Sequence, residues 1–236
     1  MKAILFSADF VGIDATKELE RLVGKPAGEI DFAVINEAAK VVNVDTKIEI
    51  NDNSFFVDGM HFIKHHFGNF DLVDLLALTS EQVEERLAKA DVIFVFGGNT
   101  EYLQYSFEKT GFAGILRNAL REKVYCGSSA GSMVLGRMIP YELQRGLEGE
   151  DWDTYGVDEY LGVVDFSILP HLGGGNLMDD ERGRKVLEVS KSVDWDIYAL
   201  SDRSAVVVDG GEVRVIGECW AKVREGEIVE QDVGEE

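Results

Sequence analysis

The run Asp91–Phe96 is the feature of this sequence that most constrains the fold. After the aspartate, its side chains are all apolar, and the run ends in Gly97-Gly98-Asn99-Thr100 before a helical stretch begins. A strand with one face in water would alternate apolar and polar residues, so a continuous apolar run predicts burial on both faces. Such strands lie at the centre of parallel sheets that helices cover on each side.

Short apolar stretches alternate with amphipathic ones along the rest of the chain. Thr79 with Gln82 is a capping-box pattern, which predicts a helix from there to Ala90, and Gly210-Gly211 is typical of a hairpin turn. The chain therefore predicts an α/β fold with a single doubly wound, mostly parallel, flavodoxin-like sheet, helices on both faces and an antiparallel C-terminal edge. Strands are expected over 2–7, 31–35, 71–78, 91–96, 123–126, 163–169, 196–200, 205–208, 213–216 and 219–223.

Length and composition are consistent with one domain. A chain of 236 residues can bury a full α/β core and does not need a second one. We see no linker and no internal repeat, so we expect a single catalytic domain over residues 1–236. Disorder is expected only at the acidic tail, 231–236.

Charge and cysteine content limit the classes of partner that can bind and the cellular compartment that we expect. A formal net charge of −21 repels nucleic acid and anionic membranes, so neither is an expected partner. No apolar run reaches the length of a membrane-spanning helix, and the N-terminal run is too short for a signal peptide. The two cysteines, Cys126 and Cys219, have neither disulfide-framework nor metal-type spacing. We expect a cytoplasmic protein.

The segment Gly127–Gly131 matches the G-x-S-x-G pattern of a nucleophile elbow, with Ser129 at its centre. Glycine on both sides lets a strand turn sharply into a helix, whose N-terminus supplies free N–H groups. Ser128 fits the spacing less well, and Cys126 is a rival nucleophile that lies inside the expected strand. A Gly-rich turn without chemistry, or one that binds an anion, remains the alternative.

A hydroxyl nucleophile needs a general base, and His171 is the best-placed histidine. It follows the expected strand 163–169 and Pro170, and it precedes a glycine loop. A loop histidine that only caps its own turn is the alternative. His61 and His65 have i,i+4 spacing, but no third ligand stands at a recognisable distance, so we expect no metal.

The imidazole must in turn be oriented by an acid. Asp202 ends another apolar strand, and it would lie at the same sheet edge as His171 if that strand is parallel. Asp165 lies inside its strand and is a weaker candidate. The polar loop that could fold over the site offers three further aspartates: Asp151, Asp153 and Asp158.

A tetrahedral intermediate also needs two convergent N–H donors. The N–H of Ala130 directly follows the nucleophile, and the loop after 91–96 ends at the same sheet edge, which favours Gly98 as the second donor. A Gly-Gly turn that only connects a strand to a helix is the alternative reading of that loop.

These segments resemble the dipeptidase E and cyanophycinase-like serine peptidases, whose fold is related to class I glutamine amidotransferases. The resemblance spans nearly the whole chain and implies that Ser129 is the nucleophile, His171 the base, and Gly98 with Ala130 the oxyanion hole. Dipeptidase E is similar here but carries Glu at the place of Asp202, and an acid soon after the nucleophile, here Glu142, is an alternative third member. The matching segments are Ala90–Thr100, Gly127–Gly131, Leu169–His171 and Ala199–Asp202.

The resemblance also implies a substrate. Both kinds of enzyme must hold an aspartate carboxylate, for which arginine is the natural partner. We expect Asn99 and Arg182 to bind substrate. To bind a carboxylate, Arg182 must overcome the negative charge of the nearby acids Asp179 to Glu181. The implied activity is hydrolysis, without cofactor or metal, of dipeptides with N-terminal aspartate through an acyl-enzyme. The alternatives are a cyanophycinase-like or isoaspartyl exopeptidase and a non-catalytic binding module; an amidotransferase-like glutaminase would need Cys at the centre of the elbow.

Overall fold

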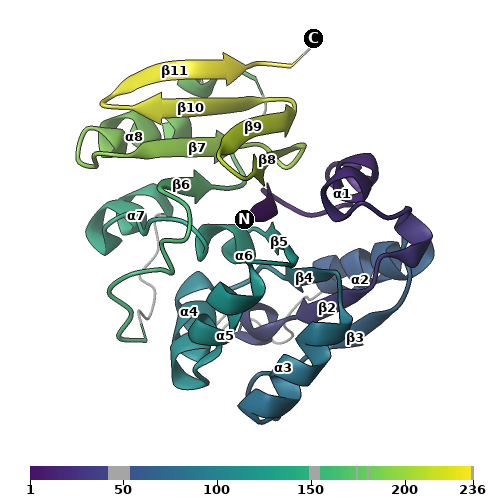
Figure 1. The fold of residues 1–236 in the computed structure, drawn as a ribbon. Coiled ribbons are helices and arrows are strands. Elements are labelled where there is room, and N and C mark those ends of the chain that lie inside the picture. The colour runs from purple at the N-terminus through teal and green to yellow at the C-terminus, as the bar shows by residue number, and fades with distance from the viewer. Residues whose placement is uncertain (42–53, 149–154, 174, 180, 235–236) are drawn as a thin grey trace.

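The computed structural model describes residues 1–41, 54–148, 155–173, 175–179 and 181–234, in which the strands form two sheets surrounded by helices (Figure 1). The strands of the larger sheet are β1 (Lys2–Phe6), β2 (Phe32–Ile35), β3 (Phe70–Leu72), β4 (Val92–Val95), β5 (Val124–Ser128), β8 (Ser204–Asp209) and β9 (Glu212–Gly217). The strands of the smaller sheet are β6 (Phe166–Leu169), β7 (Asp196–Leu200), β10 (Trp220–Arg224) and β11 (Glu227–Asp232).

Helices connect most of these strands. The α-helices are α1 (Thr16–Val23), α2 (Ser54–His66), α3 (Ser80–Lys89), α4 (Thr100–Lys109), α5 (Phe112–Ala119), α6 (Ala130–Met133), α7 (Tyr141–Glu148) and α8 (Glu181–Ser190). Three short 3₁₀ turns are η1 (Ala27–Glu29), η2 (Glu37–Val41) and η3 (Leu177–Asp179). The capping box is confirmed: the Thr79 hydroxyl accepts the N–H of Gln82, whose side chain accepts the N–H of Thr79.

The larger sheet has the strand order β3-β2-β4-β5-β1-β8-β9. Its first five strands in this order are mutually parallel, and β8 and β9 add an antiparallel edge through the hairpin at Gly210-Gly211. Each residue of β4 is fully buried, which confirms the central parallel strand expected over 91–96. The prediction of a mostly parallel α/β sheet with an antiparallel C-terminal edge is therefore confirmed.

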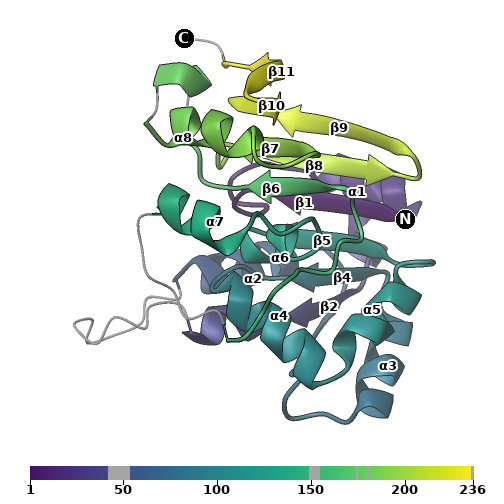
Figure 2. The same cartoon turned by 90° about the vertical axis from the view of Figure 1, so that its left-hand side faces the viewer.

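Helices cover both faces of this sheet, because alternate side chains of each strand enter two different cores. Ile93 and Val95 of β4 belong to the core that α3, α4 and α5 cover, whereas Val92 and Phe94 belong to the core that α1 and α2 cover. Figure 2 shows α3, α4 and α5 together on one side of the strands. The alternation explains why both faces of β4 had to be apolar in the sequence.

The structure differs from the expectation of one sheet, because β6, β7, β10 and β11 form a second one with the order β11-β10-β7-β6. The place beside β1 is taken by the antiparallel β8, so β6 and β7 pair in parallel with each other and not with the larger sheet. One face of the smaller sheet packs on the larger sheet's core, and the other packs on α7 and α8. Apolar patterning alone does not assign a strand to one of two sheets.

Two local expectations were wrong. The strand expected over 71–78 is only β3, because the Asp74 carboxylate accepts the N–H groups of Leu76 and Ala77 and turns the chain there. The tail over 231–236 was expected to be disordered, but its first two residues belong to β11, where Asp232 is opposite Trp220 of β10. Pairing with a neighbouring strand orders these polar residues without burying them. Glu235 and Glu236 lie outside the described residues.

The two sheets bring several strand ends to one place. β1 and β5 of the larger sheet are parallel neighbours, so their carboxyl ends lie together. β6 and β7 of the smaller sheet are parallel as well, and the chain passes from β7 to β8 of the larger sheet through residues 201–203. The carboxyl ends of β1, β5, β6 and β7 therefore meet where the two sheets join.

In the part of the chain that the structure describes, no helix combines the length and the apolar character needed to cross a bilayer. Location in the cytoplasm stays a prediction.

Candidate active site

Ser129 stands at the turn from β5 into α6, in a backbone conformation that residues other than glycine rarely adopt. Its φ of 48° and ψ of −110° depart from the allowed regions for an L-residue, at a cost of about 1–3 kcal/mol. Three hydrogen bonds hold the turn: the Ser129 N–H donates to Phe6 O (3.1 Å), and its carbonyl accepts from Ser132 (2.8 Å) and Met133 (2.9 Å). The side chain is partly exposed at the end of an otherwise buried strand.

Both glycines of the elbow are needed for close packing. A Cβ on Gly127 would lie 2.5 Å from the carbonyl oxygen of Gly131, and a Cβ on Gly131 would lie 2.1 Å from that of Val95. Neither contact is possible for a side chain, because non-bonded carbon and oxygen atoms do not approach so closely. The spacing that singled out Ser129 in the sequence therefore has a steric cause in β5, β4 and α6.

His171 follows β6 and directs its ring at the elbow. Its Nε2 lies 2.9 Å from the Ser129 hydroxyl oxygen, and its Nδ1 lies 2.6 Å from Asp202 Oδ1. The residue has a φ of 60°, in the left-handed region where histidine is enriched among non-glycine residues. About half of the side chain is exposed, so the ring is open to a substrate that approaches from solvent.

Asp202 follows β7, the parallel neighbour of β6, which explains why it reaches His171. The hydrogen bond from His171 is the main cause that lowers the pKa of the Asp202 carboxyl below its ordinary 3.8; the Ser7 hydroxyl and the charge of Arg182 act in the same direction, and burial opposes them. An ionised carboxylate only accepts hydrogen bonds, so Nδ1 must carry the proton between the two groups. In the neutral imidazole Nε2 is then an acceptor that faces the Ser129 hydroxyl.

The other acids considered in the sequence lie elsewhere or are not described. Asp165 is exposed and paired with Arg137 at 2.8 Å, and Asp158 is also exposed. Glu142 is exposed on α7, and Asp202 occupies the place beside the imidazole. Asp151 and Asp153 lie outside the described residues.

The rival nucleophiles are buried. Cys126 is fully buried inside β5, and burial strongly raises the pKa of its thiol, which disfavours the reactive thiolate. Ser128 is 4% exposed and is the last residue of the same strand. Of the three side chains, only that of Ser129 makes a hydrogen bond to a histidine in the described residues.

The loop after β4 lies against the elbow. A Cβ on Gly97 would be 2.9 Å from the Cβ of Ser129, so the two turns are in contact. Gly98 has a φ of 135°, and a Cβ there would meet the Ala38 carbonyl oxygen at 2.2 Å. In the described part of the chain, the N–H groups of Gly98 and Ala130 donate to no other backbone group. Gly98, in the loop after β4, and Ala130, the first residue of α6, thus both adjoin Ser129.

Asn99 and Arg182, the two expected substrate-binding residues, have different surroundings. Asn99 is 5% exposed, and its side-chain oxygen caps α4 by accepting the Tyr102 N–H at 2.7 Å. Arg182, in the first turn of α8, donates from Nη1 to the carbonyl oxygen of His171 at 2.8 Å. The structure thus brings Arg182 to the histidine and gives Asn99 a capping contact that the sequence analysis did not foresee.

Ser7, directly after β1, is a member of the site that the sequence analysis missed. Its hydroxyl oxygen accepts the backbone N–H of His171 at 2.8 Å and lies 3.1 Å from Asp202 Oδ1. The only available signal was a polar residue at the end of an apolar strand, which is the same signal that pointed to Asp202. A serine in that position is too common to be singled out from sequence.

The remaining histidines lie together on α2. His61 and His65 are exposed, and their Nε2 atoms are 3.0 Å apart, a distance at which one ring donates to the other. His66 stacks on Phe62 with 4.0 Å between the ring centroids. Among the described residues, no group of three or more His, Cys, Asp or Glu is arranged to hold a metal ion.

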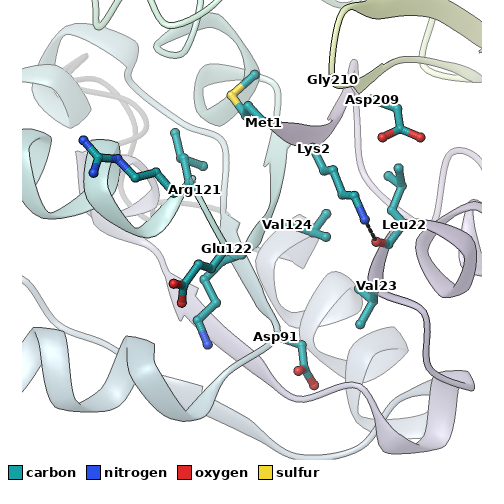
Figure 3. A pocket seen from close by; sticks show the side chains of 12 residues that line it. Met1, Lys2, Leu22, Val23, Asp91, Arg121, Glu122, Val124, Asp209 and Gly210 are labelled. Atoms are coloured by element: carbon teal, nitrogen blue, oxygen red, sulfur yellow. Dashed lines mark hydrogen bonds between the residues drawn. The ribbon is translucent and has the colours of Figure 1, made fainter.

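A separate hollow of about 370 Å³ lies at the opposite edge of the larger sheet (Figure 3). Lys2 and Val124, which start β1 and β5, help to line it, whereas Ser129 follows the other end of β5. Charges of both signs surround it, and Lys2 donates to the carbonyl oxygen of Leu22 at 2.6 Å. The hollow is thus far from the Ser129–His171 pair along the strands, and nothing in its lining suggests a reaction.

Comparison with known proteins finds peptidases that are similar to this chain in sequence. A peptidase of Pasteurella multocida that is described as uncharacterized is 26% identical over 194 residues, which cover 79% of this chain and 89% of the relative. A second uncharacterized peptidase, from Listeria monocytogenes, is 29% identical over 184 residues, or 73% of this chain and 83% of the relative.

Two solved structures have the same fold. A candidate peptidase E from Listeria monocytogenes superposes with a TM-score of 0.69 at 22% identity, over 92% of this chain and 98% of that one. A peptidase from an acI-B1 actinobacterium gives a TM-score of 0.63 at 16% identity, over 97% of this chain and 96% of that one. The model of peptidase family S51 matches residues 36–216, more than half of the sequence. This protein therefore belongs to peptidase family S51.

Proposed function

We propose that this protein is a serine-type peptidase that hydrolyses short peptides through an acyl-enzyme at Ser129. The observation that carries the proposal is the continuous hydrogen-bonded series from the Ser129 hydroxyl through His171 to Asp202, with distances of 2.9 and 2.6 Å. A nucleophile within reach of a base that an acid orients is the arrangement that activates a serine hydroxyl.

The proposed reaction begins when Ser129 Oγ attacks the peptide carbonyl carbon and His171 Nε2 takes the hydroxyl proton. The carbonyl oxygen becomes negatively charged and is stabilised by the N–H groups of Gly98 and Ala130. The C–N bond then breaks as the imidazolium returns its proton to the leaving amine. A water molecule, deprotonated by His171, attacks the ester carbon, and the released Ser129 Oγ recovers the proton.

The proposed substrates are dipeptides with N-terminal aspartate. Their support is the guanidinium of Arg182, which donates to the carbonyl of His171 and thus lies beside the catalytic groups. A guanidinium is a planar fork of donors that suits a carboxylate, and the place of Arg182 beside His171 supports a role in binding. Asn99 is proposed to help through its place between Gly98 and α4.

Turnover of a dipeptide panel tests the proposal. The panel should contain α-linked Asp-Xaa dipeptides, β-linked ones and dipeptides with other N-terminal residues. Wild-type protein should release amino acids from the α-linked Asp-Xaa members, and Ser129→Ala should not. The matched control is Ser128→Ala, since Ser128 is the adjacent serine and is buried in β5. Preferential cleavage of β-linked members would contradict the proposed substrates and favour an isoaspartyl or cyanophycinase-like exopeptidase. Equal turnover by wild type and Ser129→Ala would contradict the mechanism.

A further inference from the structure

Ser7 is a fully buried serine at the carboxyl end of β1, between the elbow and the two other candidate catalytic residues. Its hydroxyl makes three contacts: it accepts the N–H of His171 (2.8 Å) and lies 3.1 Å from both the Leu200 carbonyl oxygen and Asp202 Oδ1. Its own N–H donates to Ser204 O at 3.2 Å. The contacts of the hydroxyl all lead to the last residue of β7 and to the segments that follow β6 and β7.

A serine hydroxyl has one proton, so it donates to one of the two acceptors at a time. The Leu200 carbonyl already accepts the N–H of Leu172 at 2.9 Å. Asp202 is ionised, and a charged acceptor forms the stronger hydrogen bond. The proton of Ser7 therefore favours Asp202 Oδ1, the same oxygen that accepts the bond from His171.

The backbone of His171 is held on both sides of its Cα atom. Its N–H donates to Ser7, and its carbonyl oxygen accepts from Arg182 Nη1 at 2.8 Å. The residue needs such support because its φ of 60° is unfavourable for an L-residue and persists only when the surroundings enforce it. A change in this backbone angle would swing the imidazole away from Ser129.

We propose that Ser7 is a positioning residue that ties the backbone of His171 to the carboxylate of Asp202 and so keeps the imidazole aligned with Ser129. This role rests on the proposed function, since it concerns the same three groups. The fold requires such a link between the two sheets. Ser129 follows a strand of the larger sheet, whereas His171 and Asp202 follow strands of the smaller one. Ser7 follows β1 of the larger sheet and makes the link between them.

The loop after Ser7 packs closely on the same acid. A Cβ on Gly12 would lie 2.0 Å from the carbonyl oxygen of Asp202, so the β1–α1 loop contacts the backbone of residue 202. The turn is held by the Asp9 carboxylate, which accepts the Val11 N–H at 2.7 Å. Ser7 thus belongs to a rigid support for Asp202.

Kinetics of three variants test the proposal. Ser7→Ala removes the hydroxyl, and Ser7→Cys nearly keeps the volume but offers a weak donor and acceptor. The matched control is Ser190→Ala: Ser190 is equally buried, donates to Leu187 O at 2.8 Å and accepts the Gly226 N–H at 2.8 Å, far from Ser129 in α8.

Both Ser7 variants should lower kcat about 10- to 100-fold with KM almost unchanged, because misalignment affects the reacting groups and not substrate binding. Ser190→Ala should have the kcat of wild type, even if it is less stable. If Ser7→Ala does not fold, Ser7→Cys decides, since a residue that only fills space would tolerate the thiol. Wild-type kcat in either Ser7 variant would overturn the proposal.

A second measurement needs no activity and separates this proposal from the proposed function. Ring ¹⁵N chemical shifts report which nitrogen of a neutral histidine carries the proton, and His171 can be assigned by the signals that vanish in His171→Asn. We expect the Nδ1–H form in wild type and in Ser190→Ala, and a smaller fraction of it in Ser7→Ala and Ser7→Cys. An unchanged fraction in both Ser7 variants would contradict the role of Ser7, even if wild type cleaves no dipeptide and the proposed function fails.

Discussion

Nε2 of His171 lies 2.9 Å from the hydroxyl oxygen of Ser129, although 42 residues separate them and each follows a strand of a different sheet. The contact depends on how the two sheets meet at the carboxyl ends of β5 and β6. It also depends on two unfavourable backbone angles, φ of 48° at Ser129 and 60° at His171. Strain of this kind persists where the surroundings enforce it, and it is concentrated at functional sites.

The elbow should not tolerate a methyl group at Gly131. Gly131→Ala would place a Cβ 2.1 Å from Val95 O, so the backbone of α6 must move, at about 1–3 kcal/mol in the free energy of unfolding. Dipeptide turnover should fall with it. Gly114→Ala is the matched control, because nothing lies within 4 Å of a Cβ there in α5. The free energy of unfolding of Gly114→Ala should rise by about 0.5–1 kcal/mol, because alanine favours the helix more than glycine does. Denaturation curves of both variants test this difference.

Asp202 should be needed for turnover. In Asp202→Asn the amide can offer an N–H to Nδ1, which favours the wrong tautomer of His171, so kcat should fall about 10²- to 10⁴-fold. The control is Asp165→Asn, because Asp165 is exposed and its carboxylate is paired with Arg137 at 2.8 Å. Steady-state kinetics of both variants test the prediction. An equal fall of kcat in Asp165→Asn would point to a general effect of charge and contradict the role of Asp202.

The lowered pKa of Asp202 predicts how its contribution to stability depends on pH. Its pKa in the folded protein lies below the ordinary 3.8, chiefly through the hydrogen bond from His171, so the ionised carboxylate stabilises the folded state. This contribution is fully present above the unfolded pKa and is lost as pH falls through the folded one. Denaturation of wild type and Asp202→Asn should therefore differ at pH values above the ordinary pKa of 3.8 and converge as pH falls through the lowered pKa of the folded protein. A difference that grows towards low pH would mean that the pKa is raised.

Cys126 should play no part in the chemistry. It is fully buried in β5, and burial raises the pKa of its thiol, so alkylating reagents should not reach a thiolate. Treatment with iodoacetamide should leave dipeptide turnover unchanged. Cys126→Ala should also keep its kcat, while the small cavity lowers the free energy of unfolding by about 1 kcal/mol or more. Loss of turnover on alkylation, with mass spectrometry locating the adduct on Cys126, would favour a cysteine mechanism.

The sequence was most informative where a residue type is sterically required. The glycines around Ser129 and the buried run of β4 could be recognised because few other residues fit a sharp elbow or a strand buried on both faces. The positions of His171 and Asp202 could be inferred because both follow apolar strands, and parallel strands end at one edge.

Other features had no distinctive signal. The division into two sheets depends on which strand pairs beside β1, and β6 and β8 have similar apolar patterns. Ser7 could not be singled out because a serine after a strand is common, and its role depends on contacts with segments 164 and 195 residues away. The bond from Arg182 to the His171 carbonyl likewise depends on how α8 packs, which no local pattern describes.

The most direct test of the central claim is the reaction of the folded protein with a fluorophosphonate probe, followed by mass spectrometry of the labelled peptide. The convergence of Ser129, His171 and Asp202 predicts one adduct, on Ser129, that forms in wild type and in Ser128→Ala and is absent from Ser129→Ala. Correctly folded wild-type protein that forms no adduct, or an adduct on another residue, would contradict the account.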